Sequence, residues 1–141
     1  MATYVGTPVK RVEDPKFITG KGSYLDDIKL PGMTYAAILH SPHAHARIKS
    51  IDTSKALSVP GVIAVFTGKD MADVNALPCA WQAGGVQNNV ATPRPLEVDE
   101  VHYVGDAVAV VIAEDRYTAE DALGLIEVEY EPLPAVVDPE A

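Results

Sequence analysis

Apolar residues along this 141-residue chain gather in short segments whose spacing differs from one segment to the next. Alternation or continuous apolar runs predict five strands. They span residues 34–40, 46–51, 62–66, 107–113 and 126–131. The segments 62–66 and 107–113 are unbroken apolar runs, typical of strands covered on both faces, and 107–113 is expected at the centre of a sheet. In 126–131 apolar residues alternate with glutamates, which predicts a strand with one buried face and one solvent-exposed face. Arg47 and Lys49 are expected on a wet face of their strand in the same way.

Polar capping residues and prolines predict short helices between these strands. They span residues 13–18, 54–58 and 118–125, with another short turn through residue 72 after Thr67 and Asp70. Thr118 and Asp121 have the spacing of a capping box, and Asp115 is a second candidate cap. A right-handed crossover through 118–125 would make the strands on either side of it parallel.

The positions of proline- and glycine-rich stretches predict that the chain has three parts. Residues 1–32 are irregular and rich in proline and glycine, residues 33–131 form the folded domain, and residues 132–141 leave it as an extended tail. Short helices among about five strands indicate an α+β domain with a mixed sheet. Residues 73–100 have no helical or strand period, and a loop of that length is generally functional or ordered by a partner.

The composition excludes several classes of protein. The single cysteine, Cys79, rules out an internal disulfide framework and a [2Fe–2S] cluster ligated within this chain, which needs about four cysteines. No apolar run approaches the roughly 20 residues of a membrane span. The N-terminus has neither a basic start nor an apolar stretch, so no secretory signal is expected. These features are typical of a soluble, cytoplasmic protein.

The net charge of −9 is unevenly distributed. Residues 1–55 carry eight lysines and arginines against five acidic residues, whereas residues 56–141 carry three against fifteen. Net acidity argues against binding to nucleic acid, where contacts to phosphate dominate affinity. A basic first third and an acidic remainder favour solvated faces, with docking of the chain onto itself or onto a partner as the alternative.

The sharpest candidate for chemistry is the histidine cluster His40, His43 and His45. Neutral imidazole is a good ligand for zinc or copper. A third ligand and supporting carboxylates are absent from the neighbouring sequence, however, and Pro42 turns His40 away from the other two. The alternative is a turn whose histidines hydrogen-bond backbone or a partner.

Other motifs fail the test of spacing. Lys21-Gly22-Ser23 lacks the arrangement of a phosphate-binding loop, and Gly84-Gly85 lacks the third glycine of a dinucleotide fingerprint. Cys79 with His102 as a base is a formal nucleophile pair, but no oxyanion donor accompanies it.

The remaining candidates are better explained by structure. Asp26-Asp27 and Glu114-Asp115 suit turns and helix caps rather than paired-carboxylate catalysis. Trp81 suits packing or an interface anchor. We therefore predict no catalytic, cofactor-binding or metal-binding residue in this chain.

Three long segments carry a resemblance to a known family. Arg11-Val-Glu-Asp-Pro-Lys-Phe-Ile-Thr-Gly-Lys-Gly-Ser-Tyr-Leu-Asp-Asp27 is similar to the start of molybdenum hydroxylase large subunits. Ser41-Pro-His-Ala-His-Ala-Arg-Ile-Lys-Ser-Ile-Asp-Thr-Ser54 resembles a second signature, and Tyr103 to Pro134 a third block. The family includes xanthine dehydrogenases, aldehyde oxidoreductases and aerobic carbon monoxide dehydrogenases, and the resemblance is closest to large subunits of the carbon monoxide dehydrogenase type.

The resemblance implies the α/β-hammerhead fold and a part in an oxidoreductase. It implies oxidative hydroxylation, or oxidation of carbon monoxide, an aldehyde or a heterocycle, at a molybdopterin centre that passes electrons to [2Fe–2S] clusters and commonly to FAD. In the family the molybdopterin-binding segments and the catalytic base lie beyond this domain, and the iron–sulfur and flavin sites lie on other domains or subunits. No site residue is therefore carried over.

Three hypotheses follow for the chain. The first is a structural and assembly domain of a molybdenum hydroxylase, whose start, 73–100 loop and tail lie against the remainder of the large subunit, the iron–sulfur subunit and a flavin subunit. The second is a stand-alone hammerhead-fold binding module without an enzymatic role. The third is a small metal-binding protein that uses the histidine cluster.

Overall fold

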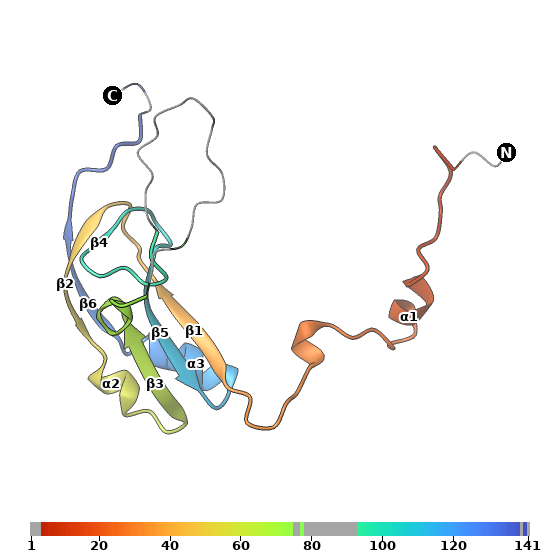
Figure 1. Cartoon of the computed structure of the whole chain (residues 1–141), viewed down its shortest axis with the longest axis horizontal. Helices are drawn as coiled ribbons and strands as arrows, with labels where there is room; N and C mark the ends of the chain where they lie inside the picture. Colours follow the sequence, from red (N-terminus) through yellow and green to blue (C-terminus); the bar gives the residue numbers. More distant parts are fainter. Residues whose placement is uncertain (1–3, 75–76, 78–92, 139, 141) are drawn as a thin grey trace. The chain divides into compact units, whose positions relative to one another are not determined.

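The computed structural model describes residues 4–74, 77, 93–138 and 140 (Figure 1). The chain divides into two compact units, residues 1–33 and 34–141, and each is described by itself.

In the described part of the first unit, residues 4–33, the regular structure consists of short helical turns. α1 spans Asp14–Ile18, with Pro15 in its first turn, where the missing amide hydrogen costs nothing. A 3-10 turn follows at Leu25–Asp27, and the Asp27 carboxylate accepts a hydrogen bond from the Tyr24 amide at 2.8 Å. The prediction that the Asp26-Asp27 pair serves a turn is confirmed for Asp27.

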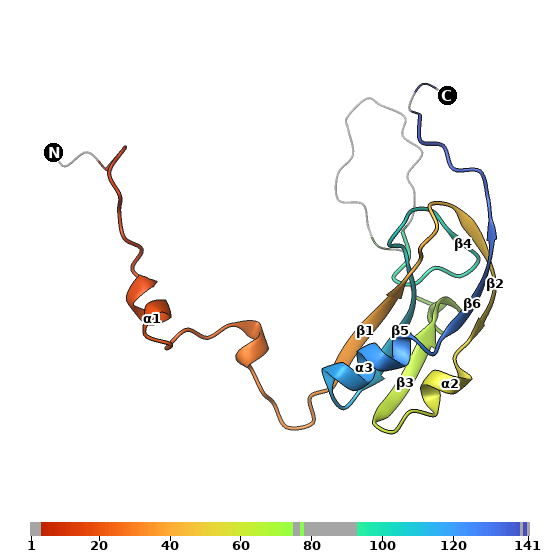
Figure 2. The same cartoon turned by 180° about the vertical axis from the view of Figure 1, so that it is seen from behind.

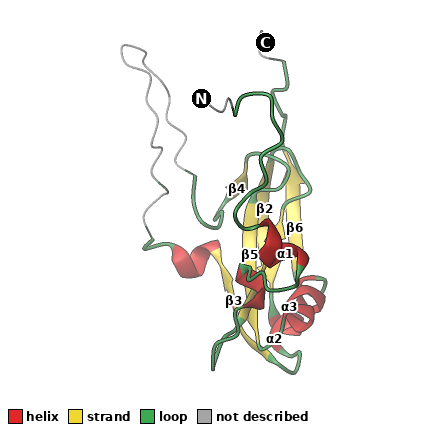
Figure 3. Cartoon of the chain, turned by 90° about the vertical axis from the view of Figure 1, so that its right-hand side faces the viewer, coloured by secondary structure: helices red, strands yellow, loops and turns green. Residues whose placement is uncertain are grey.

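The second unit is built from two three-stranded antiparallel sheets (Figures 1 and 3). The first has the strand order β1-β5-β3, and the second has the order β4-β2-β6. The strand bounds are Tyr35–His40 (β1), Ala46–Asp52 (β2), Val62–Thr67 (β3), Glu100–Val101 (β4), Ala107–Ala113 (β5) and Glu127–Pro132 (β6). The α+β class and the central place of β5 are confirmed.

Two predictions about the sheets are wrong. Each strand pairing among the described residues is antiparallel, so there is no mixed sheet there, and β5 and β6 lie in different sheets rather than side by side in parallel. The connecting helix α3, Arg116–Leu123, has eight residues and rises about 12 Å, half the roughly 23 Å length of a seven-residue strand. It is too short to return the chain to the start of β5, and β6 instead pairs with β2.

α3 begins earlier than predicted. The Asp115 carboxylate accepts a hydrogen bond from the Thr118 amide at 3.0 Å, and the Thr118 hydroxyl also donates to it. Asp115 is therefore the N-cap, because its carboxylate satisfies an amide that the first helical turn leaves unpaired. The capping box of Thr118 and Asp121 is wrong, whereas the alternative cap is confirmed.

Small side chains bring α3 close to the first sheet, where it contacts β1 and β5 on one face (Figure 2). Ala119 and Ala122 of α3 meet Ala109 and Val111 of β5 in a core that also contains Ile126. α2 (Ser54–Leu57) adds Ala56 to this core. A second, smaller cluster of Ala46, Val101 and Val108 joins β5 to the second sheet.

β3 departs from its prediction in one respect that matters below. The unbroken apolar run was expected to be covered on both faces, but the Ile63 side chain is 53% exposed and that of Phe66 is 42% exposed. β3 is an edge strand, paired only with β5, and the helices cover only one face of its sheet. Among the described residues of the second unit, no helix covers its other face.

Among the described residues, no helix is both long enough and apolar enough to span a membrane.

Candidate functional site

Backbone hydrogen bonds join the turn that carries the histidine cluster to the loop before β5. β1 ends at His40 because Ser41-Pro42 follows it. Ser41 is buried; its amide donates to the Asp106 carbonyl at 2.8 Å, and its own carbonyl accepts from the Gly105 amide at 2.8 Å. Gly105 has a φ of +99°, which glycine adopts without strain. Two distant segments are thereby held together.

The three histidines of the cluster have three separate partners. Nδ1 of His40 lies 2.7 Å from the Gly105 carbonyl oxygen, and Nδ1 of His45 lies 2.8 Å from the Pro134 carbonyl oxygen. Since a carbonyl only accepts, both nitrogens donate. The His43 ring packs against the Tyr130 ring, with their centroids 4.9 Å apart. The imidazoles therefore tie the turn to two other segments.

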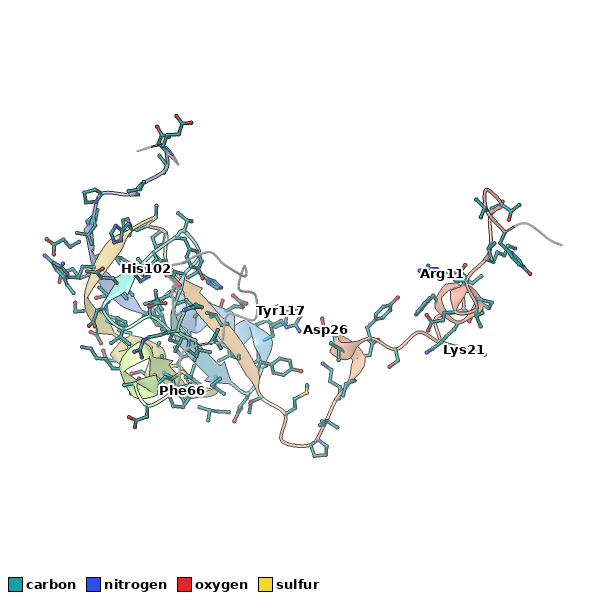
Figure 4. The ribbon with its side chains drawn as sticks, turned by 45° about the horizontal axis from the view of Figure 1, so that its top comes forward. Arg11, Lys21, Asp26, Phe66, His102 and Tyr117 are labelled. Carbon is teal, nitrogen blue, oxygen red and sulfur yellow. The ribbon has the colours of Figure 1, made fainter. Side chains whose placement is uncertain are left out.

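A different cluster, Glu97, His102 and Asp106, lies next to this turn. One ligand-type atom from each residue lies within 4.8 Å of the others. Glu97 and Asp106 are buried, whereas His102 is exposed (labelled in Figure 4). The sequence reasoning considered only His102 of these three. The spacing Glu97-x4-His102-x3-Asp106, which brings one imidazole close to two acids, is the signal that a search for ligand spacing could have used.

Hydrogen bonds within this cluster already use its carboxylates. Asp106 accepts from the His102 amide at 2.9 Å, and Glu97 accepts from the Arg94 amide at 3.4 Å. Nδ1 of His102 lies 3.6 Å from the Asp106 carboxylate. Burial raises the pKa of Glu97, and the negative charge of Asp106 raises it further, against the opposing Arg94 amide. The arrangement closes a turn and favours a proton on Glu97.

A shallow pocket extends from His102 of this cluster to residues 134–137, which follow β6. The His45 and His102 rings stack 6.2 Å apart, and Nε2 of His45 lies 3.8 Å from the Glu100 carboxylate. His45, His102, Pro134 and Val137 all line the pocket. Burial also raises the pKa of the neighbouring Tyr130.

Ion pairs line the outer face of the second sheet, two of them between β2 and β6 and one between α2 and β6. Lys55 pairs with Glu127, Lys49 lies 4.0 Å from Glu129, and Arg47 lies 3.5 Å from Glu131. The wet faces predicted for Arg47, Lys49 and the glutamates are confirmed. Basic residues of the first third and acidic residues of the remainder thus meet on a solvated face, where water screens each pair and it adds little to stability.

The other candidates have plainer roles or lie outside the described residues. Asp115 of the Glu114-Asp115 pair is a helix cap, as expected. Lys21-Gly22-Ser23 lies in irregular chain of the first unit. Cys79, Trp81 and Gly84-Gly85 lie outside the described residues, as does most of the predicted 73–100 loop.

The side chains of this chain do not supply the ligands of the [2Fe–2S] cluster that the family resemblance implies. A [2Fe–2S] cluster takes about four ligands, commonly cysteines, and the whole chain has one cysteine. The carboxylates and imidazole of Glu97, Asp106 and His102 are oxygen and nitrogen ligands of the kind that suit divalent cations rather than an iron–sulfur cluster. Glu97, His102 and Asp106 therefore do not fit a [2Fe–2S] cluster, and no reaction step is assigned to them.

Comparisons with known proteins agree with the fold. The family model for the a/b hammerhead domain of aldehyde oxidase and xanthine dehydrogenase matches residues 19–134. The carbon monoxide dehydrogenase large chain of Afipia carboxidovorans is 50% identical over 135 residues, which cover 96% of this chain and 16% of that protein. The nicotine 6-hydroxylase large subunit of Paenarthrobacter nicotinovorans is 42% identical, over 96% of this chain and 16% of that protein.

Solved structures give the same result. The quinoline 2-oxidoreductase of Pseudomonas putida 86 superposes with a TM-score of 0.83 at 45% identity, over 96% of this chain and 17% of that one. A Cu,Mo-CO dehydrogenase superposes with a TM-score of 0.80 at 50% identity, over 96% of this chain and 16% of that one. The chain thus spans about a sixth of the length of these relatives, and the expected hammerhead fold is confirmed. The chain belongs to the aldehyde oxidase and xanthine dehydrogenase family, of which it is the a/b hammerhead domain.

Proposed function

We propose that this chain is a structural and assembly domain of a molybdenum hydroxylase large subunit and holds none of the catalytic residues itself. The observation that carries the proposal is the 50% identity to a carbon monoxide dehydrogenase large chain over 135 residues. The reaction of the whole protein is then oxidative hydroxylation, or oxidation of carbon monoxide, an aldehyde or a heterocycle.

The chemistry of the described residues supports the non-catalytic part of this proposal. The histidine cluster is engaged with the Gly105 and Pro134 carbonyls and the Tyr130 ring. The buried carboxylates of Glu97 and Asp106 accept hydrogen bonds from nearby backbone amides. These groups hold segments of the chain together, which is the work of a scaffold.

The cofactors and partners of the proposal lie outside this chain. Molybdopterin, [2Fe–2S] clusters and FAD belong to the full enzyme, bound by the remainder of the large subunit, an iron–sulfur subunit and a flavin subunit in the cytoplasm. Residues 1–32 and 132–141 flank the hammerhead domain 33–131 and, together with the 73–100 loop, are surfaces for these partners.

The test is purification of the tagged chain from its own source, in the form in which it is made there. We expect a polypeptide several times heavier than 15.0 kDa, together with iron–sulfur and flavin subunits, molybdenum, iron and flavin. A metal-free 15.0 kDa species without companions would contradict the proposal and favour a stand-alone binding module.

A further inference from the structure

The open face of the β1-β5-β3 sheet is apolar across its full width. The register places Ile38 of β1, Val110 of β5 and Phe66 of β3 in one row across the sheet. Ala36, Ile112 and Ala64 form the next row. Partners directly opposite one another in antiparallel strands share a face. We call these two rows the apolar face.

The helices leave this face uncovered. Ala37, Val111 and Val65 form the row that points the other way, into the core with α3. On the apolar face, by contrast, Ile38 is 45% exposed and Phe66 is 42% exposed. Figures 1 and 2 show α3 on one side of this sheet only.

The two outward sheet faces of the molecule differ in kind. The face of β2 and β6 carries lysine, arginine and glutamate in cross-strand pairs, which suits permanent contact with water. Neither row of the apolar face contains a charged or polar side chain. A run such as 62–66 is typical of a strand that is covered on both faces. The described residues of the second unit cover one face only, and they therefore leave the apolar face without a second cover.

The size of the face indicates what covers it. Its six side chains expose on the order of 300 Å², well below the roughly 800 Å² that each partner buries in a stable complex. A second copy held by this face alone would gain too little to offset the cost of association. A segment of the same polypeptide is held nearby at a millimolar effective concentration, so a smaller contact suffices. About five sixths of the length of the relatives lies outside the part that this chain matches.

We propose that the apolar face is the docking surface for another domain of the same polypeptide, outside these 141 residues, which presents uncharged aliphatic or aromatic side chains to Ile38, Val110 and Phe66. This inference rests on the proposed function, because it requires that the chain is part of a longer protein. It assigns a partner to the exposed side chains of β1, β5 and β3.

The experiment is photo-crosslinking in the longer protein as isolated from its source. Phe66 is replaced by benzoylphenylalanine, and the matched control carries the same probe at Tyr117, an 82% exposed aromatic residue on α3 (both residues are labelled in Figure 4). We expect crosslinks from position 66 to residues of the same polypeptide beyond position 141, and none at comparable yield from position 117. Crosslinks from position 66 to residues 1–33 or 73–100, to a second copy or to another subunit, or no crosslink at all, would overturn the proposal.

A second measurement covers the case in which the probe disturbs the fold. Phe66→Glu should lower the thermal midpoint of the longer protein by several degrees, because a carboxylate would be buried at the interface, whereas Tyr117→Glu should leave the midpoint unchanged. An unchanged midpoint for Phe66→Glu would overturn the proposal. Metal analysis of the same samples separates the two proposals: the expected crosslinks in a protein without molybdenum would contradict the proposed function alone. Molybdenum in a protein that lacks these crosslinks would contradict the docking surface alone.

Discussion

Gly68 lies directly against the backbone of Glu97, and a Cβ atom on Gly68 would be 2.2 Å from the Glu97 carbonyl oxygen. The Glu97 amide donates to the Ala107 carbonyl at 2.8 Å, which fixes the backbone at that point. The segment that follows the 78–92 region therefore returns to the sheet at a place where only glycine fits.

Gly68→Ala should destabilise the chain by about 3 kcal/mol, because the backbone at Glu97 must move away from its bond to β5. The measurement is the free energy of unfolding in urea. Gly124→Ala is the matched control, since its Cβ would make an ordinary 3.5 Å contact with the Asp121 carbonyl. That variant should stay within about 1 kcal/mol of the parent, on the stabilising side. Equal effects of the two substitutions would contradict the close approach at Gly68.

Glu97→Gln should stabilise the chain at neutral pH. Burial and the charge of Asp106 raise the pKa of Glu97 above its value in the unfolded chain, which is about 4.3. The native state then binds the proton more tightly. The contribution of protonated Glu97 is fully present below the unfolded pKa and is lost as the pH rises through the folded pKa. The side-chain amide in the Glu97→Gln variant is neutral at every pH, so that variant does not lose this contribution.

The check is a series of unfolding curves from pH 4 to pH 8 for the parent, Glu97→Gln and the exposed control Glu120→Gln. The difference between the parent and Glu97→Gln should grow with pH, while the control should follow the parent. If the stability difference between the parent and Glu97→Gln shrank with rising pH, the folded chain would stabilise the ionised form of Glu97, and the prediction would be wrong.

Asp115→Ala should lower the thermal midpoint, because the Thr118 amide loses its acceptor at the start of α3. Hydrogen bonds from Thr118 also lower the pKa of Asp115, so this stabilisation is present above the unfolded pKa of aspartate and is lost as the pH falls through the lower folded value. Asp115→Asn should retain most of the midpoint at neutral pH, since asparagine also caps helices. If the asparagine variant lost as much as the alanine variant, the capping role would be wrong.

The histidine cluster should not provide a shared metal site. His43 packs on Tyr130, and His45 donates to Pro134, so both imidazoles already have structural contacts. Equilibrium dialysis with Zn²⁺ should give the same stoichiometry for the parent and for the double variant His43→Ala, His45→Ala. Loss of one equivalent of zinc in the double variant would revive the metal-binding hypothesis.

The local elements could be predicted from the sequence because their signals are local. The alternation of apolar residues and glutamates in 126–131 predicts a strand with one solvent-exposed face. The apolar run 107–113 predicts the central strand. The long-range pairing could not be predicted in this way. Nothing near β6 in the sequence says that it pairs with β2 rather than β5, because that outcome depends on the length of α3 and on glutamates that meet Arg47 and Lys49 across the sheet.

The candidate site shows the same limit. His40, His43 and His45 attract attention because they are close in sequence, yet the fold gives them different partners. Glu97 and Asp106 become neighbours only because the chain turns between β4 and β5. The exposure of β3 is a further case: the apolar run 62–66 predicts a strand covered on both faces, yet Ile63 and Phe66 are exposed among the described residues of the second unit.

The central claim, that this domain serves assembly and not catalysis, is tested most directly by Val111→Ala in the whole enzyme. Val111 is fully buried at the centre of β5, and the truncation should cost about 2 kcal/mol of stability without reaching any surface. The measurement is the yield of molybdenum-loaded enzyme together with the turnover per bound molybdenum. We predict a lower yield of assembled enzyme with an unchanged turnover per molybdenum. An unchanged yield with a reduced turnover per molybdenum would contradict the claim.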